Sequence, residues 1–384
     1  MENILLFFGG KSYEHDISIV TASQIFNKTK IDNIKLVPIY ISKQNKFYAY
    51  VASNFELKHF ASGFSVFKNK NFKEIVFVSG ENNTLFTKTA FGLKEYLKSK
   101  VAIIACHGGD GENGKLVTFL ENFNIYSQAG KSDSLAISMD KFLFKQVMKG
   151  LKVPVVRGFK LTTAEYKNRV KKIDFNLNVM GFPVVIKPNN GGSSIGLFVA
   201  KSKEEFYELA KAAFEFDDEI LIEKFISNAR EFNVAVVGNK DSFEISFIDE
   251  PVKVEEVLSF ADKYLSSDGK GKMFGEKNSM VSQKRKSCVD LDASVQNEIK
   301  HYASLIFEKL NFSGVVRIDF LFNEKEEKLF VCEVNAIPGS LAYYFFSKNQ
   351  ILLNDFVLKL IDIAKSKEGE NNKFNEDFMT SVLN

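Results

Sequence analysis

The sequence predicts an α/β protein, because short apolar runs typical of β-strands alternate with longer segments of helical periodicity. The first run, 3–8, leads into Gly9-Gly10, and a helical pattern follows over about 17–27. Strands that alternate with helices favour a parallel sheet, so an open parallel sheet is expected in the N-terminal part of the chain. A chain of 384 residues is long enough for two or three domains.

Three domains are expected, at 1–135, 136–230 and 231–384. Further strands of the first domain are predicted at 35–42, 74–79 and 100–106. The second domain is predicted to contain helices at 139–151 and 203–216, and strands at 182–188, 197–201 and 219–226. In the third domain, the Gly-, Lys- and Ser-rich stretch 254–290 is expected to form a lid loop, and the chain ends in a polar tail.

The composition is that of a soluble globular protein, with 45% hydrophobic and 26% charged residues. A net charge of +3 is too small to suggest a nucleic-acid partner. The chain lacks the long apolar run of a membrane span and the basic start of a signal peptide. Cys106, Cys288 and Cys332 are odd in number and far apart, which favours reduced thiols and a cytoplasmic location.

A hairpin near the C-terminus carries the most informative polar residues. A five-residue loop over 324–328 would place Asp319 opposite Glu333, and Arg317 opposite Asn335, with all four side chains on one face. Two opposed carboxylates need a cation between them, and with an amide oxygen they form a ligand set suited to Mg²⁺. The alternative is a solvated strand face with a chance ion pair.

The same register places two pairs of apolar side chains opposite each other nearer the loop. Phe322 is expected to face Phe330, and Leu321 is expected to face Val331.

Three glycine-rich segments are candidates for binding phosphate. The segment 109–115 nearly fits a P-loop, but Leu116 stands where a hydroxyl is needed and two acids lie inside the loop. Gly9-Gly10-Lys11-Ser12 lacks the remaining glycines of either nucleotide-binding pattern. The segment 191–196, GGSSIG, is the strongest candidate because it carries no acid and follows Lys187, although a plain hairpin turn remains an alternative.

Several motifs follow one another in a characteristic order along the chain. They are GGKSYEHDISIVTA, HGGDGENGKL, SMDK, VIKPNNGGSSIG, ILIEKFI with REFNVAV, DKYLS, RID and EVNAIPGS. The ordered set, from about residue 4 to about residue 345, resembles the D-alanine–D-alanine ligases of the ATP-grasp superfamily. This resemblance implies a three-domain ATP-grasp fold and ATP-dependent joining of two D-alanines through a D-alanyl phosphate, for peptidoglycan precursor synthesis.

The resemblance also implies roles for residues at matching positions. It assigns ATP binding to Lys141, Lys187, Ser194, Glu223, Lys224, Ile226, Glu231 and Lys263. It assigns two Mg²⁺ ions, or Mn²⁺ in their place, to Asp319, Glu333 and Asn335. It assigns catalytic roles to Glu14, Ser193, Tyr264 and Arg317. It places Glu14, His107, Gly339, Ser340 and Leu341 in the substrate pocket. A homodimer is implied as well.

Each residue also has a plain structural interpretation when taken singly. Glu14 suits a helix start, His107 suits a satisfied polar position after a strand, and Lys141 suits a solvated helix face. Tyr264 suits a surface loop. The order of the motifs favours the functional interpretation.

The sequence departs from the family pattern after the expected metal ligands. Ala336 replaces a threonine, Tyr344 replaces a serine that touches the second substrate, and Asn113 replaces an aspartate. D-lactate and D-serine therefore stay open as second substrates, although Lys263-Tyr264 resembles the D-alanine type. Another ATP-grasp carboxylate–amine ligase and a non-catalytic nucleotide-binding regulator are the remaining alternatives.

Overall fold

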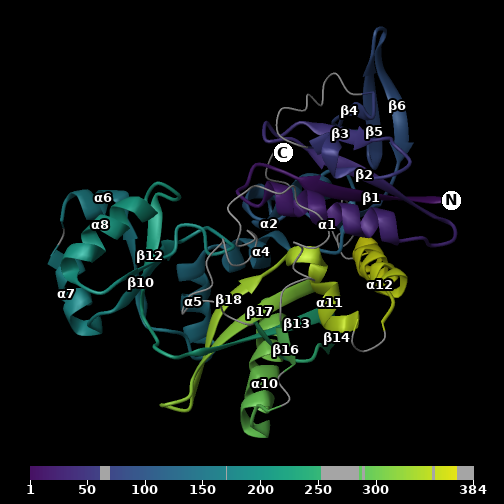
Figure 1. The fold of residues 1–384 in the computed structure, drawn as a ribbon. Coiled ribbons are helices and arrows are strands. Elements are labelled where there is room, and N and C mark those ends of the chain that lie inside the picture. The colour runs from purple at the N-terminus through teal and green to yellow at the C-terminus, as the bar shows by residue number, and fades with distance from the viewer. Residues whose placement is uncertain (61–69, 170, 252–284, 288–289, 348–350, 370–384) are drawn as a thin grey trace, which may run out of the picture.

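Three β-sheets organise the chain in this computed structural model, which describes residues 1–60, 70–169, 171–251, 285–287, 290–347 and 351–369 (Figure 1). Most of the expected lid, the polar tail and the residues Lys263 and Tyr264 lie outside the described residues. Among the helices that are described, none has both the length and the apolar character to cross a membrane.

The first sheet has eight strands in the order β6-β5-β4-β3-β2-β1-β7-β8. Its strands are β1 (Glu2–Gly9), β2 (Ile34–Ile41), β3 (Phe47–Tyr50), β4 (Phe72–Val76), β5 (Thr84–Thr89), β6 (Gly92–Lys98), β7 (Val101–Ile104) and β8 (Tyr126–Ser127). The run from β2 through β1 and β7 to β8 is parallel, as expected, and β1 is fully buried from Ile4 to Phe8. The strands β3 to β6 pair antiparallel, so the sheet is mixed. The strand predicted at 74–79 overlaps β4, whereas β3, β5, β6 and the antiparallel pairing were not predicted.

Helices follow the strands of this sheet along the chain. They are α1 (His15–Lys28), α2 (Gly109–Glu112), α3 (Lys115–Glu121), α4 (Ser132–Met139) and α5 (Lys141–Gly150), with the short helix η1 at Leu57–Phe60. The helix α1 packs on β1. Asp140 caps the N-terminus of α5, and its carboxylate accepts a hydrogen bond from the Leu143 amide at 2.8 Å. This cap fixes the first turn of α5, which carries Lys141.

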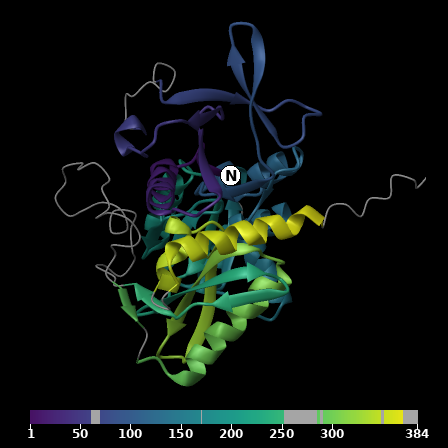
Figure 2. The same cartoon turned by 90° about the vertical axis from the view of Figure 1, so that its right-hand side faces the viewer.

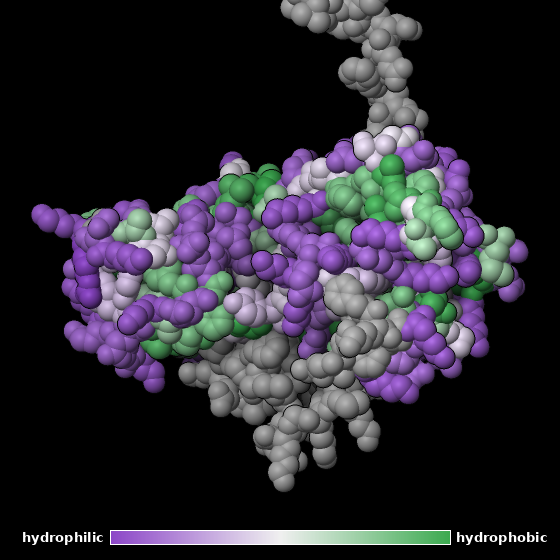
Figure 3. Space-filling view, turned by 90° about the horizontal axis from the view of Figure 1, so that it is seen from above, coloured by the Kyte–Doolittle hydropathy of each residue, from purple (hydrophilic) through white to green (hydrophobic). Residues whose placement is uncertain are grey.

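The second sheet is antiparallel, in the order β11-β10-β12-β9, and has its own hydrophobic core. It contains β9 (Gly158–Thr162), β10 (Val184–Pro188), β11 (Phe198–Ala200) and β12 (Glu219–Lys224), with α6 (Thr163–Lys167), α7 (Lys171–Met180) and α8 (Lys203–Ala213). Figure 1 shows this lobe to one side of the other two sheets. Seen from above, its surface is largely hydrophilic (Figure 3).

The third sheet runs β16-β15-β13-β17-β18, with β14 paired to β13. Its strands are β13 (Arg230–Asn239), β14 (Ser242–Ile245), β15 (Asp249–Pro251), β16 (Arg285–Ser287), β17 (Gly314–Asn323) and β18 (Lys328–Asn335). The remaining helices are α10 (Ala293–Lys309), η5 (Gly339–Ala342), α11 (Tyr343–Ser347), α12 (Leu353–Ser366) and η6 (Lys367–Gly369). The helix α12 contacts β7 and β8 of the first sheet as well as β13 and β17 of the third, and the first and third sheets share one core (Figure 2).

The hairpin of β17 and β18 confirms the polar part of the predicted register and corrects the apolar part. Asp319 faces Glu333 and Arg317 faces Asn335, as expected. A β-bulge at Cys332 then shifts the pairing by one residue, and Lys328 belongs to the strand, which leaves the shorter turn 324–327. The predicted apolar pairs are wrong for this reason.

Beyond the bulge, Leu321 faces Phe330 and Phe322 faces Leu329. A bulge inserts an unpaired residue and redirects nearby side chains. Here the consecutive residues Cys332 and Glu333 both line one pocket, whereas neighbours in a regular strand point to opposite faces.

Candidate active site

A pocket of about 370 Å³ lies between the second and third sheets. Its walls come from β10, β12, the loop 191–197, β17, β18 and the start of α5. The volume falls in the range of pockets that hold small ligands and cofactors. The following residues predicted to bind ATP or metal line it: Lys141, Lys187, Ser194, Glu223, Lys224, Ile226, Glu231, Asp319 and Glu333.

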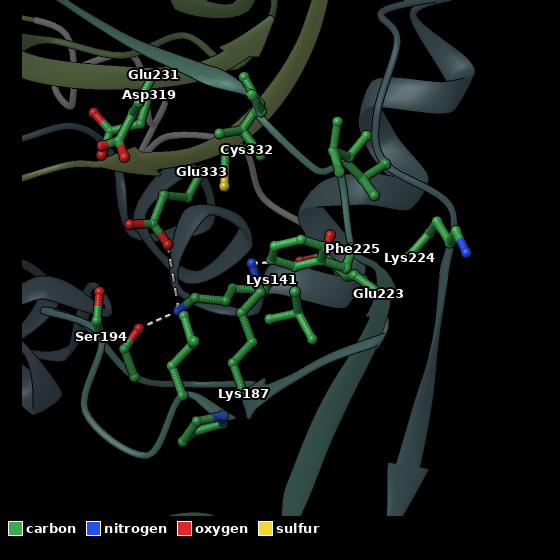
Figure 4. A pocket seen from close by; sticks show the side chains of 18 of the residues that line it. Lys141, Lys187, Ser194, Glu223, Lys224, Phe225, Glu231, Asp319, Cys332 and Glu333 are labelled. Atoms are coloured by element: carbon green, nitrogen blue, oxygen red, sulfur yellow. Dashed lines mark hydrogen bonds and ion pairs between the residues drawn. The ribbon is translucent and has the colours of Figure 1, made fainter. Parts of the chain in front are cut away.

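Two buried lysines reach the pocket from different elements (Figure 4). Lys141 on α5 donates to the Gly191 carbonyl, and its Nζ lies 3.9 Å from a carboxylate oxygen of Glu333. Lys187 on β10 forms an ion pair of 2.6 Å with Glu223 on β12. The two strands pair antiparallel with Val185 opposite Glu223, so Lys187 and Glu223 are diagonal neighbours on one face.

The side chain of Lys224 points away from this cluster (Figure 4). Its Nζ donates to the Gly181 carbonyl at 3.3 Å. Because side chains alternate along a strand, Glu223 is directed into the cluster and Lys224 away from it.

Three acidic side chains line the pocket opposite the lysines. Asp319 and Glu231 lie side by side on neighbouring strands, and Glu333 is directed at Lys141 (Figure 4). Arg317 holds both oxygens of Asp319 through two hydrogen bonds of 2.7 Å, and the Asn335 amide donates to the same carboxylate at 3.1 Å.

The charge balance around Asp319 is unfavourable despite Arg317. Burial raises the pKa of Asp319, Arg317 lowers it, and the charges of Glu333 and Glu231 raise it again. A hard cation would relieve this repulsion, and the carboxylate and amide oxygens are ligands that Mg²⁺ accepts. Within the described part of the chain, no three His, Cys, Asp or Glu side chains gather as a ready metal cluster. The carboxylate and amide oxygens therefore fit Mg²⁺ by their chemistry and charge. Phosphate or water would supply the remaining ligands of the ion.

A second, smaller cavity of about 30 Å³ adjoins the pocket and shares Glu333 with it. Its polar lining comes from all three sheets or from the loops next to them. The polar lining residues are Glu14, His107, Glu112, Ser193, Arg317, Glu333 and Asn335. Gly339 also lines it, which brings most of the predicted substrate residues together at one place.

Glu14, just before α1, is enclosed by the glycine-rich loop and by the loop after β7. The Ser193 hydroxyl donates to its carboxylate. A Cβ atom at Gly192 would lie 2.6 Å from a carboxylate oxygen of Glu14, and one at Gly108 would lie 2.8 Å away. A side chain at either position would therefore push the Glu14 carboxylate aside.

His107 uses both ring nitrogens within the protein. Nδ1 lies 2.7 Å from the Ile337 carbonyl, and Nε2 lies 2.8 Å from the Thr21 hydroxyl. Burial lowers its pKa to about 4, against the opposing effect of the Ile337 hydrogen bond. The imidazole is thus neutral and links α1 to the loop after β18.

Two further residues of the predicted substrate pocket interact with the first domain. The Ser340 hydroxyl donates to Gln24 at 2.9 Å, its amide donates to Thr21 at 3.1 Å, and Leu341 is buried in the core. Tyr344, which was expected near the second substrate, is nearly buried beside Phe345, with ring centroids 4.7 Å apart.

Two residues of this site, Glu112 and Lys145, were not predicted from the sequence. Glu112 accepts hydrogen bonds from the amides of Gly108 at 2.9 Å and Ile337 at 3.1 Å, and burial and the charge of Glu14 raise its pKa to about 7. Lys145 forms an ion pair with Glu223 deep in the wall of the pocket. Lys145 lies four residues after Lys141 on one face of an amphipathic helix, and this spacing was the available signal.

Comparison with known proteins identifies the family. Residues 3–127 match the model described as D-ala D-ala ligase N-terminus, and residues 147–351 match D-ala D-ala ligase C-terminus. A D-alanine–D-alanine ligase from Thermosipho melanesiensis is 34% identical over 364 residues, which cover 95% of this chain and 94% of that protein.

Solved structures share the fold. A D-alanine–D-alanine ligase from Coxiella burnetii matches with a TM-score of 0.76 at 23% identity, over 96% of this chain and 95% of that one. A D-Ala:D-Ser ligase from Enterococcus faecalis matches with a TM-score of 0.74 at 24% identity, over 94% of this chain and 99% of that one. At such identities the likeness concerns the fold alone.

The fold, with a pocket of about 370 Å³ between the second and third sheets, belongs to the ATP-grasp class. Within this class, the chain belongs to the D-alanine–D-alanine ligase family.

The buried neutral His107 predicts a loss of stability in acid. Its pKa is about 4 in the folded chain and 6.5 as an ordinary histidine, so only the unfolded chain takes up a proton between these values. The stabilisation is complete above about pH 6.5 and is lost as the pH falls toward 4, and it amounts to about 2 kcal/mol between about pH 7 and 4.5. Denaturant unfolding of wild type and His107→Gln at both pH values measures it.

Between about pH 7 and 4.5, the free energy of unfolding of His107→Gln should fall by about 2 kcal/mol less than that of the wild type. His301→Gln, at an exposed position of α10, serves as the control for removal of an imidazole elsewhere. Equal acid sensitivity of wild type and His107→Gln would contradict the assignment.

Proposed function

We propose that this chain joins two D-alanines by phosphorylating the carboxylate of the first with ATP and letting the amine of the second attack the resulting D-alanyl phosphate. The observation that carries the proposal is the shared wall of the two cavities, where Glu333 borders both. A nucleotide in the larger cavity would have its terminal phosphate next to an amino acid in the smaller one. A carboxylate is a poor electrophile, and such phosphoryl transfer needs positioning and charge neutralisation.

The larger cavity supplies charge for the nucleotide phosphates. We assign phosphate contacts to Lys141, Lys187 and Ser194, because both lysines are buried and directed at the pocket. Asp319, Glu333 and Asn335 would hold Mg²⁺, which when bound neutralises phosphate charge. The hinge 223–226 would border the adenine and Glu231 the ribose, with Lys263 acting from the lid.

The smaller cavity supplies contacts for the amino acid. Glu14 would bind the ammonium group of the first D-alanine, and Ser193 fixes the Glu14 carboxylate by its hydrogen bond. Arg317 would stabilise the oxyanion that develops when the second amine attacks. Tyr264 would close over the reactants, and exclusion of water would protect the acyl phosphate. His107 and the loop 339–341 would shape the pocket, His107 through its two hydrogen bonds.

The remaining assignments follow from this activity. We propose that the product serves peptidoglycan precursor synthesis, that the enzyme works in the cytoplasm, and that it forms a homodimer. The domain boundaries proposed near residues 135 and 230 agree with the three sheets, which span residues 2–127, 158–224 and 230–335.

A coupled assay tests the proposal directly. Purified protein with ATP and Mg²⁺ should release phosphate only when D-alanine is added, and mass spectrometry should detect the dipeptide. D-serine and D-lactate, each supplied with D-alanine, test the second position. Faster turnover with D-lactate than with D-alanine at neutral pH would contradict the dipeptide assignment, and so would preference for D-serine.

The substitution Glu14→Gln should abolish most D-alanine turnover, about 100-fold or more in kcat/KM, because the ammonium group loses its counter-charge. Binding of ATP, measured by calorimetry, should change little, since Glu14 lies in the smaller cavity. Asp16→Asn, an exposed change in the first turn of the same helix, is the matched control. Equal losses in ATP and D-alanine affinity would argue against the assigned role.

The substitution Glu333→Gln should lower kcat by about 100-fold and raise the Mg²⁺ concentration needed for half-maximal activity. Titration of Mg²⁺ at saturating ATP and D-alanine measures both effects. Glu326→Gln, in the exposed turn of the same hairpin, should leave the titration unchanged. An unaltered Mg²⁺ requirement in Glu333→Gln would refute the assigned metal role.

A further inference from the structure

A buried chain of three charges lies in the wall of the larger cavity. The Glu223 carboxylate pairs through one oxygen with Lys187, at 2.6 Å, and through the other with Lys145. The side chains of Lys145 and Glu223 are only 3% and 6% exposed. Lys187 and Glu223 line the cavity, and Lys145 approaches Glu223 from α5.

The two lysines differ in what surrounds them. Lys145 does not line the cavity, and its Nζ lies 3.4 Å from the Val156 carbonyl. Lys187 comes from β10 beside the glycine-rich loop, where the nucleotide phosphates are proposed to lie. A ligand in the cavity can therefore reach Lys187 at the cavity wall, whereas Lys145 stays behind Glu223.

Phosphate binding by Lys187 creates an electrostatic problem at Glu223. When the Lys187 ammonium contacts a phosphate, its positive charge is shared between the phosphate and the Glu223 carboxylate, so it neutralises Glu223 less completely. A buried charge that loses its partner is strongly destabilising. The state of Glu223 is clear, because the two lysines outweigh the effect of burial and lower its pKa to about 2, so it stays ionised.

We propose that Lys145 is a positioning residue for ATP binding, which keeps Glu223 neutralised and in place while Lys187 contacts the nucleotide phosphates. This inference rests on the phosphate role proposed for Lys187. With both lysines present, the cluster of two cations and one carboxylate carries one net positive charge toward the phosphates. Without Lys145 the cluster is neutral, and Lys187 is retained by Glu223.

The variant Lys145→Met tests this, because methionine keeps the apolar stem and removes the charge. The Kd for ADP and the KM for ATP should rise about 10- to 100-fold, whereas the KM for D-alanine should change by less than about threefold. Lys145→Arg should recover most of the affinity. Lys149→Met, one turn further along the same helix at an exposed position, is the matched control.

A double-variant cycle separates charge compensation from a general structural role. In a Glu223→Gln background there is no carboxylate to neutralise, so adding Lys145→Met should change the Kd for ADP by less than about threefold. This comparison also serves if Lys145→Met alone fails to fold. Calorimetric binding of ADP requires no turnover, so it tests Lys145 even if the chain makes no dipeptide.

Three results would overturn the proposal. One is an unchanged ADP affinity in folded Lys145→Met. Another is a parallel rise in the KM values of ATP and D-alanine. The third is a loss of ADP affinity in the Glu223→Gln background as large as in the wild-type background.

Discussion

Compensation of buried charge is the constraint on which this site depends. Around the site, Lys141, Lys145, Lys187 and Arg317 are almost fully removed from water, and each of these cations lies against a carboxylate. Of these carboxylates, Glu223 and Asp319 are buried and Glu333 is partly exposed. Such groups are tolerated only when their partners are held in good geometry. The elements that hold them are the first turns of α5, two paired strands of the second sheet, and the bulged hairpin of the third.

The three sheets that surround the site belong to two separate hydrophobic cores. The first and third share one hydrophobic core and are joined by α12, whereas the second has a core of its own. The hydrogen bonds of Lys141 with the Gly191 carbonyl and of Ser193 with Glu14 connect the loop carried by the second lobe to the rest. The rings of Tyr13 and Phe216 meet edge to face, with centroids 5.9 Å apart, and add an apolar contact across the same gap. The cavities consequently lie where separate cores meet, which is a common place for ligand sites.

Local sequence patterns predicted much of the fold and of the site. The features that depend on long-range packing could not be predicted from them. The predicted pairing of Asp319 with Glu333 is right because two differences offset each other: the turn 324–327 is one residue shorter than the expected loop, and the bulge at Cys332 adds one residue to the strand. The bulge at Cys332 could not be inferred, since an extra residue in one strand leaves no mark in an apolar sequence. The strands β3, β5 and β6 were missed, and so was the antiparallel pairing of β4, which overlaps the strand predicted at 74–79. Their chain neighbours are loops and short turns, without the helices that would identify them.

Lys145 and Glu112 show a second reason why the sequence alone does not identify every residue of the site. A lysine in a helix and an acid in a glycine-rich loop are normally solvated, and only the folded chain shows that both are buried against specific partners. Lys141 had the same ambiguity, and the order of the motifs resolved it. Position in the fold, and not residue type, decides whether such a charge belongs to a site.

The charge of the smaller cavity bears on its choice of ligand. Glu14 and Glu112 are close enough for the charge of one to raise the pKa of the other, and Glu333 lines the same cavity. Arg317 is already committed to Asp319 by two hydrogen bonds. The cavity is therefore short of positive charge until a cationic ligand enters. An ammonium group supplies that charge and a hydroxyl group does not, so the proposed first position favours an amino acid over a hydroxy acid on electrostatic grounds alone.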